Sequence, residues 1–124
     1  MVDLGLFPMP ADPGTTVSTY VKSWTSGDFD TTRSTLADDV TFLGPLGTAD
    51  GIEECIGGLQ GLKQIVESSE QHQVIVDGDD VCLIYDLHTT KFGTIPTAGW
   101  FQLRDGKITS IRVYFDPRPL APPS

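Results

Sequence analysis

The hydrophobic pattern of this chain changes its period once, and that change limits the folds available to it. Near the amino end, Val17, Tyr20 and Trp24 recur at helical spacing and form one apolar stripe. Residues 72–115 instead alternate with a period of two, which is typical of β-strands separated by tight turns. Helices first and consecutive strands afterwards predict an α+β fold with a mostly antiparallel sheet.

Capping and turn residues set the expected bounds of these elements. The first helix is expected to begin at Thr15 or Thr16 and to end at Gly27. The second is expected to start at a cap on Asp30 and to end at 38–39. Strands are expected over 40–43, 72–76, 81–90, 98–103 and 108–115, with hairpin turns at 77–80 and 104–107.

A third helix is expected from about residue 51 to residue 68, and it contains three glycines. Gly57, Gly58 and Gly61 each cost about 1 kcal/mol relative to alanine in a helix. Two interpretations are open. The glycines either widen a cavity or admit another backbone, or they mark a broken helix.

Length and charge narrow the class of protein. The chain has 124 residues, which is enough for one domain. We expect this domain at residues 15–118, between an irregular arm (1–14) and a proline-rich tail (119–124). The formal net charge of −9 disfavours nucleic acid and anionic membrane surfaces as partners. We expect a cytoplasmic protein with buried thiols at Cys55 and Cys82, because the sequence shows neither a membrane span nor a secretion signal.

Two segments, Thr15–Gly47 and Trp100–Pro119, resemble the SnoaL-like branch of the nuclear transport factor 2-like (NTF2-like) superfamily. The resemblance implies a cone-shaped fold, in which three N-terminal helices lie against a strongly curved sheet with a pocket inside. It does not imply one reaction, because the superfamily includes isomerases, cyclases, epoxide hydrolases, dehydratases and binding modules.

Two catalytic patterns of that superfamily are not retained. The tyrosine of the ketosteroid isomerases corresponds to Tyr20, but their base and oxyanion-hole aspartate correspond to Gly44 and Gly99, which have no side chain to transfer a proton. The limonene epoxide hydrolases need an aspartate where this chain has Val113, and an arginine that is missing near 86–88.

The SnoaL-type cyclases have a looser pattern, for which Asp86 and His88 are the acid–base candidates and Tyr20 is a hydrogen-bond donor. Asp86 and His88 are two residues apart on one strand, so they share a face and could act together as general acid and base. That face lines either the pocket or the convex side, where superfamily members often dimerise. The alternate face is more apolar and is the default choice for the core: Val81, Leu83, Tyr85 and Leu87.

We therefore expect a cofactor-independent acid–base enzyme of the cyclase, isomerase or dehydratase type, acting on a small hydrophobic, oxygenated molecule. The alternatives are a non-catalytic binding or accessory module, and a structural dimer whose own side chains fill the pocket. A homodimer through the sheet is expected, with Trp100 and Tyr114 on its outer face. No metal is expected, because His72 and His88 are the only histidines and show no metal-ligand spacing. The expected pocket residues are Trp24, Phe42, Leu59, Tyr85, Gly99, Phe101, Val113 and Phe115.

Overall fold

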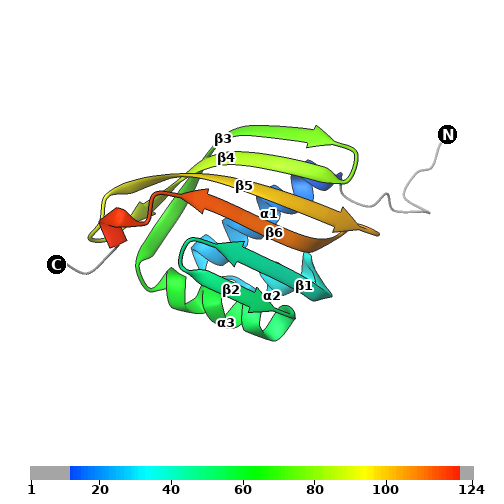
Figure 1. The fold of residues 1–124 in the computed structure, drawn as a ribbon, viewed down its shortest axis with the longest axis horizontal. Helices are drawn as coiled ribbons and strands as arrows, with labels where there is room; N and C mark the ends of the chain where they lie inside the picture. Colours follow the sequence, from blue (N-terminus) through cyan, green and yellow to red (C-terminus); the bar gives the residue numbers. More distant parts are fainter. Residues whose placement is uncertain (1–11, 121–124) are drawn as a thin grey trace.

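The computed structural model describes residues 12–120, so most of the expected arm and the end of the tail lie outside the described residues. Three α-helices, six strands and a short 3-10 helix follow one another in this part of the chain (Figure 1). Their bounds are α1 Pro13–Ser26, α2 Phe29–Ser34, β1 Leu36–Gly44, β2 Gly47–Asp50, α3 Ile52–Lys63, β3 Val66–Asp77, β4 Asp80–Thr89, β5 Thr94–Arg104, β6 Lys107–Phe115 and η1 Arg118–Leu120.

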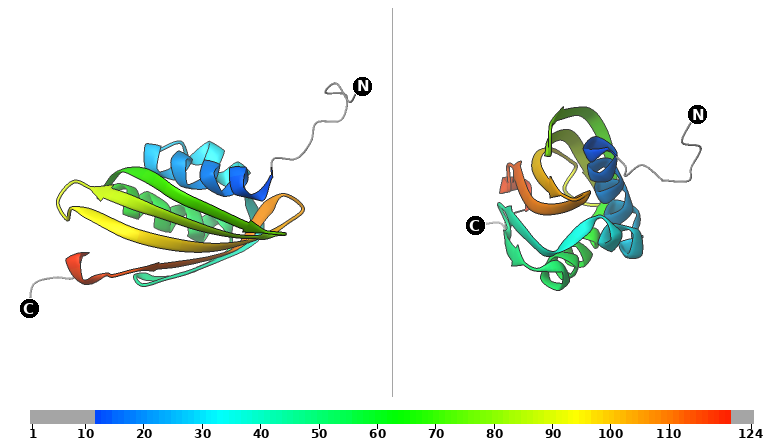
Figure 2. Two further views of the ribbon diagram at one scale, coloured as in Figure 1. Left: turned by 90° about the horizontal axis from the view of Figure 1, so that it is seen from above. Right: turned by 90° about the vertical axis from the view of Figure 1, so that its right-hand side faces the viewer.

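The strands form one open sheet in the order β2-β1-β6-β5-β4-β3. Neighbouring strands are antiparallel except β1 and β6, which are parallel. The sheet curls around the helices, and α1 lies across its concave face (Figure 2). The predicted fold class is therefore confirmed: the chain has the α+β, cone-shaped NTF2-like fold.

Capping residues explain where the first two helices begin and end. The Asp12 carboxylate accepts a 2.9 Å hydrogen bond from the Thr15 backbone N–H, so α1 starts at Pro13, slightly earlier than predicted. Gly27 ends it in the left-handed conformation, with φ of 89°, as predicted. The second helix is capped by Asp28, so the prediction of Asp30 as its cap was wrong.

Two predicted boundaries between helix and strand were also wrong. The second helix ends at Ser34, and residues 38–39 belong to β1, whose first residue Leu36 pairs with Ile108 of β6. The third helix ends at Lys63 rather than at residue 68, because the chain joins the sheet at Val66 as the start of β3. In both places, pairing with another strand overrides the local helical preference.

The sequence prediction omitted one strand, β2. It is only four residues long and pairs with the end of β1 as a hairpin, with Thr48 opposite Leu43. This short hairpin matters because it lies next to α3 (Figure 1), and residues of the two elements line a cavity.

The core lies between the helices and the concave face of the sheet. The four alternate β4 residues assigned to the core by default are all buried there. At its centre, the rings of Tyr20 and Phe101 meet edge to face with centroids 5.6 Å apart. The Phe101 ring also covers Gly99 so closely that a Cβ there would be 2.5 Å from Phe101 Cε1.

Candidate functional site

Side chains of the protein fill the centre of the cone, where the pocket was expected. Tyr20 and Trp24 are each 2% exposed and Phe101 is fully buried. Tyr85, Gly99 and Val113 belong to the same buried region. These residues form packed core, and none of them lines the apolar cavity that lies between α3 and the β1–β2 hairpin.

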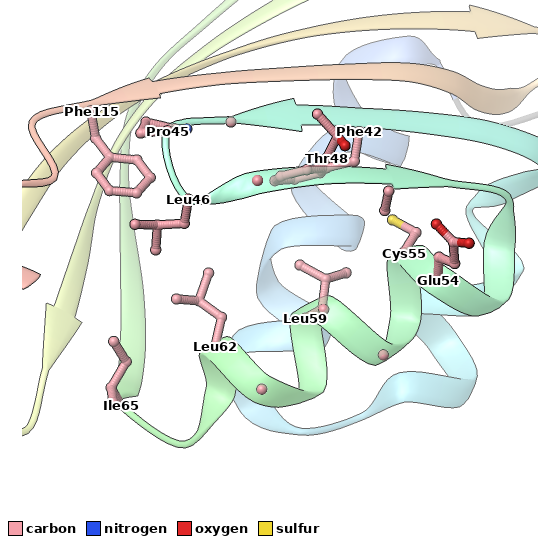
Figure 3. Close-up of a pocket in the computed structure, with 16 residues that line it drawn as sticks. Phe42, Pro45, Leu46, Thr48, Glu54, Cys55, Leu59, Leu62, Ile65 and Phe115 are labelled. Atoms are coloured by element: carbon pink, nitrogen blue, oxygen red, sulfur yellow. The ribbon is translucent and has the colours of Figure 1, made fainter.

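That cavity has a volume of about 420 Å³ and lies between α3 and the β1–β2 hairpin (Figure 3). Three of the expected pocket residues, Phe42, Leu59 and Phe115, do line it. Figure 3 shows that Leu46 of the hairpin and Leu62 of α3 face each other across the cavity. Most of the wall is therefore apolar and comes from elements at the edge of the sheet.

The three glycines of α3 all line this cavity. The helix is continuous through them, and a Cβ built at Gly57, Gly58 or Gly61 would find no atom of the protein within 4 Å. No other backbone approaches them, which supports the interpretation that they widen a cavity. A larger side chain at any of these positions would therefore take up space that now belongs to the cavity.

Few polar side chains reach the cavity, namely those of Thr48, Glu54 and Cys55. Glu54 Oε1 accepts a 2.9 Å hydrogen bond from the Asp50 backbone N–H, which ties β2 to the first turn of α3. Burial raises the pKa of the Cys55 thiol to about 11, so it is neutral near pH 7 and a weak nucleophile. Most of the lining is apolar, so the cavity suits the apolar part of a small molecule.

Asp86 and His88 share the face of β4 opposite the core, on the convex side of the sheet. They are not bonded to each other. The Nε2 atom of His72 on β3 lies 2.8 Å from Asp86 Oδ2, and His88 Nε2 lies 3.2 Å from Glu70 Oε1. His88 Nδ1 also shares a 3.0 Å hydrogen bond with Thr94 Oγ1. The hydrogen bond to Asp86 raises the pKa of His72.

Tyr20 lies on the other side of the sheet, within the core. Burial, followed by the influence of Cys55 and Tyr85, raises the pKa of its phenol well above the usual value. The hydroxyl therefore stays protonated, as a hydrogen-bond donor must. The structure does not bring Tyr20 together with Asp86 and His88, because β4 separates them.

The convex face of the sheet carries several exposed apolar side chains. Trp100 is 40% exposed and Tyr114 is 54% exposed, and the Arg112 guanidinium lies 5.5 Å from the centre of the Trp100 ring. The three α-helices of residues 12–120 lie on the other face (Figure 2). A homodimer through this face stays a prediction.

Sequence reasoning predicted Leu59 of α3 but missed other cavity residues, such as Thr48 of β2, Glu54 of α3 and Ile65 in the turn after α3. The sequence signal for this cavity was the set of three glycines in α3. Three glycines on one amphipathic helix leave part of the helix surface without side chains, so that part can line a cavity. The meaning of this signal depended on the β1–β2 hairpin opposite, and that hairpin is too short to show a clear alternation.

The fold is that of the NTF2-like superfamily, and comparison with known proteins specifies the family. The SnoaL-like domain family matches residues 17–111, so the chain belongs to that family. No match was found among curated proteins. Of the helices in residues 12–120, none is long and apolar enough to cross a membrane.

Solved structures with this fold include relatives from several bacteria. A protein from Kribbella flavida is 28% identical, with a TM-score of 0.81 over 86% of this chain and 88% of that one. An NTF2-like protein from Cytophaga hutchinsonii is 30% identical, with a TM-score of 0.80 over 93% and 98% of the two chains. An epoxide hydrolase of the limonene epoxide hydrolase-like type from Mycobacterium tuberculosis is 23% identical, with a TM-score of 0.75 over 90% and 87%, and shows the fold alone.

Proposed function

We propose that this protein binds a small, largely apolar molecule in the cavity between α3 and the β1–β2 hairpin. The observation that supports the proposal is an apolar cavity of about 420 Å³ with one wall made of helix glycines. This volume lies within the range of about 300–1,000 Å³ that is usual for small-molecule sites. The glycines are costly in a helix, by about 1 kcal/mol each, and an open wall explains their presence.

The lining also limits the chemistry of the ligand. Phe42, Leu59 and Leu62 offer apolar contact, whereas Thr48 and Glu54 offer the few polar side-chain groups. A compact hydrocarbon or aromatic skeleton with one hydroxyl or amine would satisfy both kinds of group. A strongly anionic ligand is disfavoured, because Glu54 lines the cavity and the chain has a net charge of −9.

The test uses a neutral fluorescent probe, N-phenyl-1-naphthylamine, whose emission rises in an apolar site. We expect saturable binding to the full chain and at least tenfold weaker binding to Gly58→Leu, whose new side chain would occupy the cavity. Gln60→Leu is the matched control, because Gln60 is on the same helix but does not line the cavity. Equal probe affinity in the wild type and Gly58→Leu, with both folded, would refute the proposed binding site.

The second candidate is a cofactor-independent acid–base enzyme that uses the same cavity. Glu54 favours it, because it is the carboxylate that lines the cavity. Asp86 and His88 are on the opposite face of the sheet, so an apolar substrate in the cavity would not reach them.

Isomerisation of cyclohex-3-en-1-one to its conjugated ketone, followed by ultraviolet absorbance, tests for proton transfer of this kind. Turnover that is lost in Glu54→Gln and kept in Asp86→Asn would support the enzyme. Loss in Asp86→Asn with full activity in Glu54→Gln would instead support the acid–base role first expected for Asp86. Probe binding without turnover in the wild type would favour the binding module.

A further inference from the structure

A second group of side chains lies on the convex face of the sheet. Unlike the mostly apolar lining of the cavity, it consists of carboxylates and a histidine. Glu70 and His72 of β3 and Asp86 of β4 each place one potential ligand atom within 4.8 Å of the others. In residues 12–120 no other three histidine, cysteine or carboxylate side chains come together in this way. His88 adjoins the group through its 3.2 Å contact with Glu70.

The backbone explains why these side chains converge. Glu70 is directly opposite Asp86 in the register of β3 and β4, so their side chains point to the same face. The register shifts between Gln71 and Gln73, which makes His72 the extra residue of a β-bulge. A bulge re-aims a side chain, and here the His72 ring reaches to 2.8 Å from the Asp86 carboxylate. The group is therefore built into the sheet and does not depend on a loop.

The donor set suits a divalent transition metal. One imidazole nitrogen and two carboxylate oxygens are ligands that Zn²⁺ accepts at about 2.0–2.2 Å, which places tetrahedral ligand atoms about 3.3–3.6 Å apart. The donors here already lie between 2.8 and 4.8 Å from one another, so small rotations of the side chains would suffice. An imidazole ligand favours zinc and its neighbours over Mg²⁺ and Ca²⁺, which prefer all-oxygen sites.

The electrostatics and exposure of the group also favour a cation. The carboxylates of Glu70 and Asp86 both lie beside the His72 ring, so this place on the surface concentrates negative charge that a cation would neutralise. Two carboxylates would neutralise the two charges of the ion. The side chains of His72 and Asp86 are 45% and 22% exposed, which leaves room for the ion to enter and for water as the fourth ligand.

We propose that Glu70, His72 and Asp86 form a binding site for a divalent transition-metal ion, with Zn²⁺ as the best fit, and that His88 orients Glu70. The His88 ring is itself held by Thr94 on β5, in the manner of the outer partners that fix metal ligands elsewhere. Because β3 is an edge strand of the sheet, the bound ion would fasten this edge to β4 at the bulge. The site is separate from the cavity and does not depend on the proposed ligand binding.

The test is calorimetric titration of the full chain, prepared without a histidine tag and stripped with a chelator, using ZnCl₂ and then MgCl₂. We expect one equivalent of Zn²⁺ to bind and no Mg²⁺ to bind. His72→Gln and Asp86→Asn should each weaken the zinc affinity at least tenfold, and His88→Gln should weaken it less. A thermal melt with ZnCl₂ should show a rise in Tm for the wild type that His72→Gln lacks.

Two control variants make the result specific. Asp79→Asn removes the same charge as Asp86→Asn from the 77–80 turn at the other end of the β3–β4 hairpin, which forms no such group, and should leave zinc binding unchanged. Cys82→Ser removes a half-buried thiol on the same strand and should also have no effect. Melts without metal show whether each variant folds. Absence of zinc binding, equal binding by folded His72→Gln, or loss only in Cys82→Ser would each overturn the proposal.

Discussion

The glycine wall of the cavity leads to a quantitative prediction about stability. Replacing Gly57, Gly58 and Gly61 by alanine should make the protein more stable, although natural glycines are often required where they occur. Each alanine removes the entropy cost of a helical glycine, about 0.5–1 kcal/mol, and the structure shows no atom within 4 Å that the new methyl groups would strike. The three positions are neighbours on one helix, so their effects are coupled, and we expect a total gain of about 2 kcal/mol, below three times the largest single gain.

Urea denaturation followed by circular dichroism measures this gain as an increase in the free energy of unfolding with an unchanged m-value. For a domain of this size the midpoint temperature should rise by roughly 3–6 °C for each kcal/mol. A triple variant no more stable than the wild type would refute the reasoning. It would mean that this stretch is not helical in solution, or that another part of the chain packs against the glycines.

Three further predictions concern the core and the convex face. Gly99→Ala should destabilise the fold by about 1–3 kcal/mol through overpacking against Phe101, and in urea denaturation the same change should cost less in a Phe101→Leu background than in the wild type. Burial holds the Cys55 thiol neutral up to about pH 11, whereas the unfolded chain ionises it above about pH 8.5. The contribution of the neutral Cys55 thiol to the free energy of unfolding is therefore complete below pH 8.5 and falls by roughly 1–2 kcal/mol at pH 10. Cys55→Ala should not show this loss when the free energy of unfolding is measured across this pH range. If a dimer forms through the convex face, Ile84→Lys should convert it to monomer in sedimentation equilibrium with no loss of helical signal, and a dimer that survives would exclude this face.

The order of elements and the facing of the strands could be predicted because both follow from local periodicity. The alternate residues of β4 are buried as their greater apolarity indicates, and Gly27 ends α1 because a left-handed residue there favours glycine. The start of β1 could not be predicted in this way. Leu36 is strand because it pairs with Ile108, more than seventy positions later, and no local pattern reports such a partner.

The place of the cavity needed the three-dimensional packing. Periodicity shows that Tyr20 and Phe101 point inward, but it does not show that their rings meet and fill the centre. The remaining space depends on a hairpin of which one strand has four residues. The metal-ligand group was hidden for a related reason. Its donors are on two strands and depend on the bulge at His72, whereas the sequence search considered spacing within single segments.

The most direct test of the central claim is a two-dimensional ¹H–¹⁵N spectrum recorded while N-phenyl-1-naphthylamine is added to the full chain. We predict that amide signals of Leu46, Gly58 and Gly61 around the cavity shift with the probe and saturate together. Signals of Ile84 and Trp100 on the convex face should stay in place. Shifts confined to the convex face, or no saturable shift at all, would contradict a small-molecule site between α3 and the β1–β2 hairpin.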